Sequence, residues 1–446
     1  MSKLLLTNAR LVNEGEIRDA DVLIDGERIV NIGASIVAPE GATVIDVAGK
    51  YLLPGMIDDQ VHFREPGMTH KGDLATESAA AAAGGITSFM DMPNVNPQTT
   101  TRSALRDKYG IAENRCTANY GFYLGATNSN IEEIKALQVG EGAGIKAFMG
   151  ASTGDMLVDN PESLERLFEH APTIVLTHCE DSPMIWDNEA AAREKFGDDV
   201  PFSEHPAIRS AEACLKSSRF ATDLARRHDA LLHILHLTTA IEMDLFSTAH
   251  RSEKRITAEV CVHHLWFDES RYDELGAKIK CNPAVKGAAD RKALIAALND
   301  QRIDIIATDH APHTAAEKAE SYFKAPAGLP LVQHALLTLF DLVADNQLSI
   351  ELVADRTSHA VADIFGVKDR GYVREGWYAD LVIVDPNKPY LVGPSNLLSK
   401  CQWSPFEGHE FSASIDTTIV NGAVVYHDGG LSGEIAGQKL EFTRSR

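Results

Sequence analysis

The sequence predicts an α/β protein, a (β/α)8 TIM barrel with a small β-sandwich domain formed by the N- and C-terminal segments. Three observations lead to this prediction. In the middle of the 446-residue chain, short apolar runs alternate with longer helical patterns, which is typical of βαβ units. Eight such units fit into about 300 residues, a length that suits a barrel. Both ends of the chain instead show short strand patterns separated by turn signals.

The two ends of the chain are expected to fold together. The first fifty residues contain three strand patterns, at 4–12, 21–32 and 42–49. The last eighty residues contain two similar strand patterns, at 379–386 and 418–426. Because neither end has enough strands to be stable alone, we expect residues 1–53 and 370–446 to form one sandwich domain and residues 54–369 to form the barrel.

The barrel strands are expected where short apolar runs end in polar residues. The eight candidates are Leu52–His62, Ile86–Met92, Ala118–Leu124, Gly144–Met149, Thr173–His178, Leu232–His236, Ile256–Cys261 and Ile303–Asp309. Helical patterns such as Lys71–Ala83 and Ala211–Arg227 lie between them.

The composition narrows the range of functions. Sixty-four acidic residues against 42 basic ones give a formal charge of −22, which repels nucleic acid and anionic lipid. No apolar run reaches the roughly 18 residues of a spanning helix, and the first twenty residues lack the apolar core of a signal peptide. The six cysteines include no CxxC pair, which is typical of reduced thiols. We therefore expect a cytoplasmic protein without nucleic-acid or membrane partners.

Polar side chains gather at the carboxyl ends of the expected strands. They are His62, Lys146, His178, His236 and Asp309. In a barrel these ends converge on one face, where active sites are built. A single histidine at a strand end is more often a core residue, but three imidazoles with a carboxylate and a lysine indicate a metal site.

Lys146 lies inside an apolar strand, where burial of its charge is costly. A functional lysine explains this position, although a side chain that reaches out between the helices is the alternative.

The motifs that carry these residues resemble the cyclic amidohydrolases, and within them the dihydroorotase group related to hydantoinase and allantoinase. The motifs are PGMIDDQVHFREPG, MPN at Met92, GIKAFMG, THCED at Thr177, HILHLTT at His233 and TDHAPH at Thr308. The resemblance covers nearly the whole chain and implies a metal-dependent opening and closing of a cyclic amide.

The resemblance also implies roles for the strand-end residues. Lys146 corresponds to a lysine that takes up CO2 and bridges two zinc ions as a carbamate. His178 and His236 hold the second ion, while His62, Lys146 and Asp309 serve the first. Asp309 also acts as the general base and acid, taking a proton from the attacking water and delivering it to the leaving ring nitrogen.

Position 60 departs from the pattern of the family. The usual first-strand signature is His-x-His, and here Gln60 stands in place of its first histidine. A glutamine carbonyl is a weaker ligand than imidazole. Three outcomes remain open: a loosely held first metal, a site with one zinc, or a protein that has lost catalysis.

Arg64 is the expected anchor for an anionic substrate, because a guanidinium grips a carboxylate bidentately. A surface salt bridge with Glu65 or Asp59 is its alternative. The resemblance adds Asn94, Asn282 and His313 as substrate contacts, although both asparagines are also suited to turns beside prolines.

Two further segments near these motifs have expected roles. His263 and His264 are expected to be structural or to support the ligands. Residues 314–329 are expected to form a mobile loop over the site.

The leading hypothesis is the reversible, zinc-dependent conversion between L-dihydroorotate and N-carbamoyl-L-aspartate in pyrimidine biosynthesis, by a homo-oligomer of two or more chains. An allantoinase or hydantoinase activity is the nearest alternative. An inactive scaffold for aspartate carbamoyltransferase is the alternative from another class, and Gln60 is its motivation.

Overall fold

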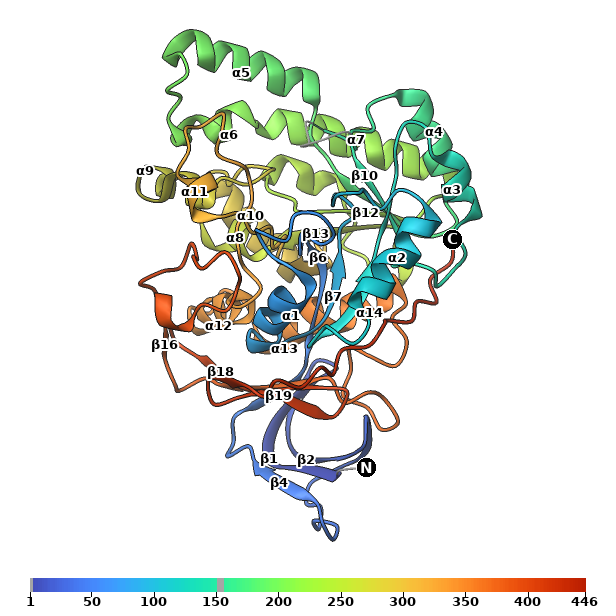
Figure 1. Ribbon diagram of the computed structural model, residues 1–446, viewed down its shortest axis with the longest axis vertical. Coiled ribbons are helices and arrows are strands. Elements are labelled where there is room, and N and C mark those ends of the chain that lie inside the picture. The colour runs from blue at the N-terminus through green and yellow to red at the C-terminus, as the bar shows by residue number, and fades with distance from the viewer. Residues whose placement is uncertain (1–2, 151–155) are drawn as a thin grey trace.

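Eight parallel strands form the barrel of the structure, a computed structural model that describes residues 3–150 and 156–446 (Figure 1). The strands are β6 (Met56–Val61), β7 (Ile86–Asp91), β8 (Asn119–Phe122) with its continuation β9 (Leu124–Gly125), β10 (Ile145–Phe148), β11 (Val175–His178), β12 (Leu232–Ile234), β13 (Ile256–Cys261) and β14 (Ile305–Ala307). Each pairs in parallel with the next along the chain. The predicted fold class is confirmed.

The barrel closes between its first and last strands. The backbone N–H of His62 donates to the carbonyl of His310 over 2.7 Å, and Val61 forms a parallel bridge with His310. The Asp58 carboxylate accepts hydrogen bonds from the backbone N–H and the hydroxyl of Thr308, at 3.1 and 2.6 Å. These contacts hold β6 against the segment that follows β14.

A nine-stranded sheet joins the two ends of the chain beside the barrel. Its strands are β1 (Lys3–Asn13), β2 (Glu16–Asp25), β3 (Arg28–Gly33), β4 (Thr43–Asp46), β5 (Tyr51–Pro54), β15 (Leu381–Asp385), β18 (Ser414–Val420), β19 (Ala423–His427) and β20 (Gly430–Leu431). In Figure 1 the blue and red strands of this layer lie side by side at the end of the molecule that holds the N-terminus. β5 pairs with β1 on one side and with β15 on the other.

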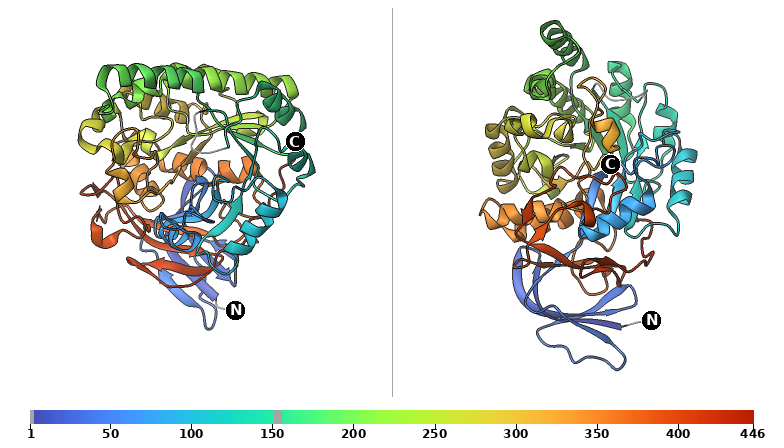
Figure 2. Two further views of the ribbon diagram at one scale, coloured as in Figure 1. Left: turned by 45° about the horizontal axis from the view of Figure 1, so that its top comes forward. Right: turned by 60° about the vertical axis from the view of Figure 1, so that its left-hand side comes forward.

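Helices surround the barrel, with α5 and α7 crossing the end that lies opposite the nine-stranded sheet (Figure 2). The helices are α1 (Leu74–Ala83), α2 (Arg102–Ala112), α3 (Ile131–Ala136), α4 (Pro161–His170), α5 (Ser182–Phe196), α6 (His205–Ile208), α7 (Ala211–His228), α8 (Val262–Trp266), α9 (Tyr272–Leu275), α10 (Ala288–Asn299), α11 (Ala315–Lys318), α12 (Ala335–Ala344), α13 (Ile350–Ala354) and α14 (Ala360–Phe365). None of the described helices is both long enough and apolar enough to cross a membrane.

The two helical patterns that the sequence analysis names, Lys71–Ala83 and Ala211–Arg227, form α1 and α7, each with a side-chain cap at its start. α1 begins after Asp73, whose carboxylate accepts from the backbone N–H of Thr76, and its alanine run favours the helix. α7 begins after Ser210, whose hydroxyl accepts from Ala213, and it ends in basic residues that complement the helix dipole.

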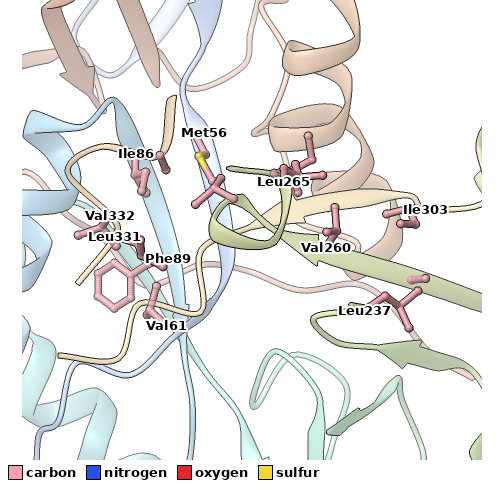
Figure 3. Close-up of a cluster of buried hydrophobic side chains, with 14 of the residues drawn as sticks. Met56, Val61, Ile86, Phe89, Leu237, Val260, Leu265, Ile303, Leu331 and Val332 are labelled. Carbon is pink, nitrogen blue, oxygen red and sulfur yellow. The ribbon is translucent and has the colours of Figure 1, made fainter. Parts of the chain in front are cut away.

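The main core lies between the barrel strands and the helices around them. Figure 3 shows part of it, where Met56 and Val61 of β6 and Ile86 and Phe89 of β7 are drawn with apolar residues of later segments. A separate cluster joins Ile57, Leu176 and Ile305 of barrel strands to Tyr123 and to Phe365 of α14. The nine-stranded sheet has a third cluster of its own.

The first barrel strand differs from its prediction. The sequence predicts one strand over Leu52–His62, whereas the structure has two: β5 in the nine-stranded sheet and β6 in the barrel. The chain changes sheets at Gly55, whose N–H donates to the carbonyl of Asp380 over 2.9 Å. A Cβ at this position would lie 2.1 Å from Cγ2 of Thr87, so only glycine fits. Apolar patterning alone does not reveal such a change of sheet.

Replacing Gly55 with alanine is expected to lower the free energy of unfolding by about 1–3 kcal/mol, because the added methyl group overlaps buried Thr87. Urea denaturation followed by circular dichroism measures the change. Gly110→Ala is the control: it lies in α2 with no atom within 4 Å of an added Cβ, and should stabilise slightly. A Gly55→Ala protein as stable as the parent would contradict the packing argument.

Candidate functional site

A pocket at the carboxyl ends of the barrel strands collects all ten residues that the sequence analysis assigns to metal or substrate binding. Its lining includes Gln60, His62, Arg64, Asn94, Lys146, His178, His236, Asn282, Asp309 and His313. These residues span about 250 positions of the chain, and the barrel brings them together because parallel strands end at one face. Phe148, Ala311 and residues 326–328 complete the lining.

Asp309 lies between residues of the first strand. Its Oδ1 atom is 3.1 Å from Nε2 of His62 and 3.2 Å from Nε2 of Gln60. Burial opposes ionisation of Asp309, but the contact with His62 and the nearby His263 and Lys146 together lower the pKa of the carboxyl. Asp309 is therefore a carboxylate at neutral pH and can accept a proton.

Gln60 directs its amide N–H toward Asp309 in this arrangement. Its Oε1 atom faces the thiol of Cys261 at 3.9 Å. The sequence analysis considered Gln60 as a weak carbonyl ligand, whereas here it is a hydrogen-bond donor to the Asp309 carboxylate.

Lys146 is fully buried in β10 with its ammonium nitrogen toward the pocket, 4.6 Å from the centre of the Phe148 ring. Within the described residues, Nζ has no hydrogen-bond partner. Burial lowers the pKa of Lys146 to about 8, against the attraction of Asp309 and Glu259. A substantial fraction of the amine is thus neutral near physiological pH, which is the form that reacts as a nucleophile.

His178 and His236 form a pair at the ends of β11 and β12. Nδ1 of His178 lies 3.0 Å from Nε2 of His236. Glu180 accepts from Nε2 of His178 over 2.8 Å and also pairs with Arg209. Burial alone would raise the pKa of Glu180, but the charge of Arg209 and the contact with His178 lower it to about 2. Burial also lowers the pKa of both histidines, so their rings are neutral.

Arg64 is the buried cation of the pocket. Nε donates to the carbonyl of Pro312 over 3.1 Å, and Nη2 lies 3.0 Å from Nε2 of His313. Burial lowers the pKa of Arg64 to about 10, which leaves the guanidinium charged at neutral pH. Because its contacts in the structure are with neutral groups, it is not part of the surface salt bridge that was its alternative; Glu65 pairs with Arg115 instead.

Three pocket residues have a backbone in the left-handed region. The φ angles are 68° for Arg64, 40° for His236 and 51° for Asp309. Such conformations are uncommon for residues other than glycine and gather at functional sites.

The remaining predicted residues also lie at the pocket or beside it. The Oδ1 atom of Asn94 is 2.8 Å from Nδ1 of His62, while Oδ1 of Asn282 has no partner among the described residues. His263 and His264 are fully buried behind the lining, and Nε2 of His264 donates to the carbonyl of Pro283.

The loop expected over the site contributes to the pocket wall through residues 326–328. Lys318 in this loop donates to the carbonyls of Lys280, Pro326 and Gly328, which tethers the loop to its neighbours.

Several residues of the site were missed by the sequence analysis. Glu180 follows His178 by two positions at the end of β11. This two-residue spacing is the signal in the sequence that could have revealed Glu180 as the partner of His178. Asp59, His233 and Glu259 form a buried group of metal-ligand residue types that the sequence analysis did not identify, and Cys261 joins His263 and His264 in another such group.

The pocket residues fit a metal ion. Nδ1 of His62 contacts Asn94 and its Nε2 faces the Asp309 carboxylate, so either a proton on Nε2 or a metal ion completes this contact. His178 likewise gives its Nε2–H to Glu180 and leaves Nδ1 free to coordinate, as histidine ligands do. Imidazole and carboxylate ligands suit zinc and related divalent metals.

Fold and site together define a hydrolase-like barrel with a polar, metal-compatible mouth. Residues 51–425 match the amidohydrolase family, and the chain belongs to this family. This confirms the resemblance that the sequence motifs indicate.

Relatives agree over nearly the full length. A dihydroorotase from Halobacterium salinarum is 34% identical over 423 residues, which cover 93% of this chain and 94% of the relative. A dihydroorotase from Methanosarcina acetivorans is 32% identical over 100% of this chain and 97% of its own. Among solved structures, the L-hydantoinase (dihydropyrimidinase) from Arthrobacter aurescens has a TM-score of 0.93 at 25% identity, with 99% of this chain and 100% of that chain covered.

Replacing Glu180 with glutamine is expected to weaken zinc binding in the pocket by about 10- to 100-fold, because His178 loses the charge that orients it and raises its basicity. Competition with a chromophoric chelator measures the affinity. Glu165→Gln is a matched control, since Glu165 also contacts one histidine and one arginine but lies outside the pocket. Equal affinities in both variants would contradict the role of Glu180.

Proposed function

We propose that this chain is a dihydroorotase, which interconverts L-dihydroorotate and N-carbamoyl-L-aspartate in pyrimidine biosynthesis. The observation that carries the proposal is the buried Arg64 guanidinium in the same pocket as Asp309, Lys146 and the histidines. A substrate that bears a carboxylate gives this cation a partner, whereas a neutral cyclic amide leaves it without one. The dihydroorotases among the relatives support the same assignment.

Substrate binding is assigned to the side of the pocket near Arg64. His313 contacts Arg64, and burial together with the neighbouring cations lowers its pKa far below the usual range, so it acts as a neutral hydrogen-bonding group. Asn282 faces the pocket with an unused amide oxygen among the described residues, which suits a ring N–H of the substrate.

Asp309 is assigned the proton transfers. In hydrolysis, water attacks the ring carbonyl carbon and the amide C–N bond breaks; the carboxylate takes the proton from the water and delivers it to the leaving nitrogen. Both of its contacts, with His62 and Gln60, involve Oδ1, so we assign the transfer to Oδ2.

Zinc is the proposed cofactor, held by Lys146, His178 and His236, with His62 and Asp309 as the ligands of a second ion if one binds. Lys146 is proposed to be carbamylated, because its lowered pKa favours the neutral amine that takes up CO2. When bound, zinc polarises the carbonyl and lowers the pKa of the attacking water. The donor role of Gln60 toward Asp309 favours one ion over two.

A hydantoinase-type activity is the second candidate. It is favoured by the solved structures similar to this chain, which include L-hydantoinase and a dihydropyrimidinase from Brevibacillus agri at 26% identity and a TM-score of 0.91. The two candidates differ in whether the substrate needs the Arg64 cation.

Other parts of the proposal concern the whole chain. The division into a sandwich domain (1–53 and 370–446) and a barrel (54–369), and assembly into a dimer or larger homo-oligomer, stay predictions. A cytoplasmic location is supported by the six cysteines, all of which are unpaired and buried.

The test of the proposed function is steady-state hydrolysis of L-dihydroorotate by zinc-supplied protein, with Asp309→Asn as the paired variant. We expect clear turnover by the parent protein and a loss of about 100- to 10,000-fold in kcat in the variant. Asp300→Asn, a substitution outside the pocket, should have the parent rate. Folded, zinc-loaded protein that hydrolyses hydantoins or allantoin but not dihydroorotate would favour the second candidate, and protein inactive on all of them would favour a scaffold.

Replacing Arg64 with methionine is expected to raise KM for dihydroorotate by about 10- to 100-fold, because a charged hydrogen-bonding pair with the substrate is lost. Arg115→Met is the control, since Arg115 pairs with Glu65 away from the pocket. Initial rates over a range of substrate concentrations measure KM. An unchanged KM in Arg64→Met would contradict the assignment of the substrate carboxylate to Arg64.

A further inference from the structure

A second group of ionisable side chains lies inside the barrel, one contact away from the pocket. Asp59 of β6, His233 of β12 and Glu259 of β13 are all fully buried. Nε2 of His233 lies 3.4 Å from Oδ2 of Asp59 and 3.6 Å from Oε2 of Glu259. One ligand atom of each residue therefore faces a common point.

These atoms lack the hydrogen bonds that buried polar groups normally have. Within residues 3–150 and 156–446, no donor reaches either oxygen of Asp59 or Oε2 of Glu259, and Nε2 of His233 is also without a hydrogen-bond partner. Two buried carboxylates in this state are costly unless a positive charge lies between them.

The orientation of His233 indicates which positive charge fits. Its Nδ1 lies 2.8 Å from the hydroxyl oxygen of Thr257, and that hydroxyl donates to the carbonyl of Leu232. The Thr257 oxygen therefore accepts a hydrogen from Nδ1, and the Nε2 lone pair of a neutral His233 faces the two carboxylates. Metal-binding histidines are fixed in this way by a hydrogen bond at their other nitrogen.

The alternative is a proton on Nε2, which would give an imidazolium ion between two carboxylates. Charge-assisted N–H···O contacts are about 2.7–2.9 Å long, shorter than both distances here. Bonds of about 2.0–2.2 Å to tetrahedral zinc place neighbouring ligand atoms about 3.3–3.5 Å apart, which agrees better. Against the effect of burial, the two carboxyl groups raise the pKa of His233 to about 9 when only a proton lies between them, and a divalent ion at the same point supplies more positive charge than that proton.

We propose that Asp59, His233 and Glu259 bind a structural divalent transition-metal ion of the zinc class inside the barrel, separate from the pocket. The site joins β6, β12 and β13 of the barrel. It also bears on the pocket, because the other oxygen of Glu259 accepts from the backbone N–H of His236 over 3.0 Å. The proposal does not depend on the reaction that the pocket catalyses.

The decisive experiment is a crystal structure of full-length protein produced with zinc in the medium, with anomalous data collected on both sides of the zinc absorption edge. We expect a zinc peak enclosed by Asp59, His233 and Glu259, resolved from any peak beside Lys146 and His178. A map without a peak at the buried group would overturn the proposal, whether or not the pocket holds zinc. The measurement uses the parent protein, so it does not depend on a variant that folds.

A metal count gives an independent test. Asp59→Asn should lose one equivalent of zinc per chain after desalting, and His178→Ala should separately lose the pocket zinc. Glu242→Gln is the matched control, because this buried carboxylate is satisfied by Ser218 and Thr239 and lies outside the group. Asp59→Asn protein with the full zinc content of the parent would contradict the proposal.

Discussion

The closure of the barrel between β6 and β14 is the constraint on which the site depends. Asp58 accepts two hydrogen bonds from Thr308, and the adjacent residue is Asp309. This contact places Asp309 against His62 and Gln60, which lie about 250 positions earlier in the chain. Burial raises the pKa of Asp58 to about 8, although both hydrogen bonds oppose this shift. The Asp58 carboxyl group thus fixes the relative position of the first and last strands, although its burial is unfavourable.

The interior of this barrel balances charges that water does not screen. Lys146 and Arg64 supply positive charge at the pocket, and Asp309 and Glu180 supply negative charge. Asp309 contacts His62 and Glu180 pairs with Arg209, whereas Nζ of Lys146 has no hydrogen-bond partner within the described part of the chain. A buried, unpaired ammonium is costly, so this arrangement favours a neutral amine or a modified lysine at position 146. The charged groups of the pocket are therefore arranged to bind a ligand, and they do not stabilise the pocket when it is empty.

The barrel, and the gathering of the candidate residues at one end of it, could be predicted because both follow from residues at strand ends. All ten predicted residues line one pocket, since polar residues after apolar runs are visible without coordinates. The change of sheet at Gly55 was not predictable, because it depends on Thr87 lying against that glycine. Asp59 was missed for a similar reason: the pairing of β6 with β7 shifts register between Asp58 and Val61, and such irregularities redirect side chains. Asp59 meets His233 of β12 and Glu259 of β13 only because closure of the barrel brings these strands near β6.

Gln60 connects these features and explains how the site tolerates its departure from the family pattern. An imidazole at this position offers a lone pair to a metal, whereas the glutamine gives an N–H to Asp309 at 3.2 Å. The hydrogen bond stabilises the carboxylate form of Asp309 without using it as a metal ligand. We infer that the lost ligand shifts metal binding toward Lys146, His178 and His236. Under the proposed function, Asp309 then stays available for proton transfer, and a glutamine in place of the histidine alters metal binding without removing the acid–base group.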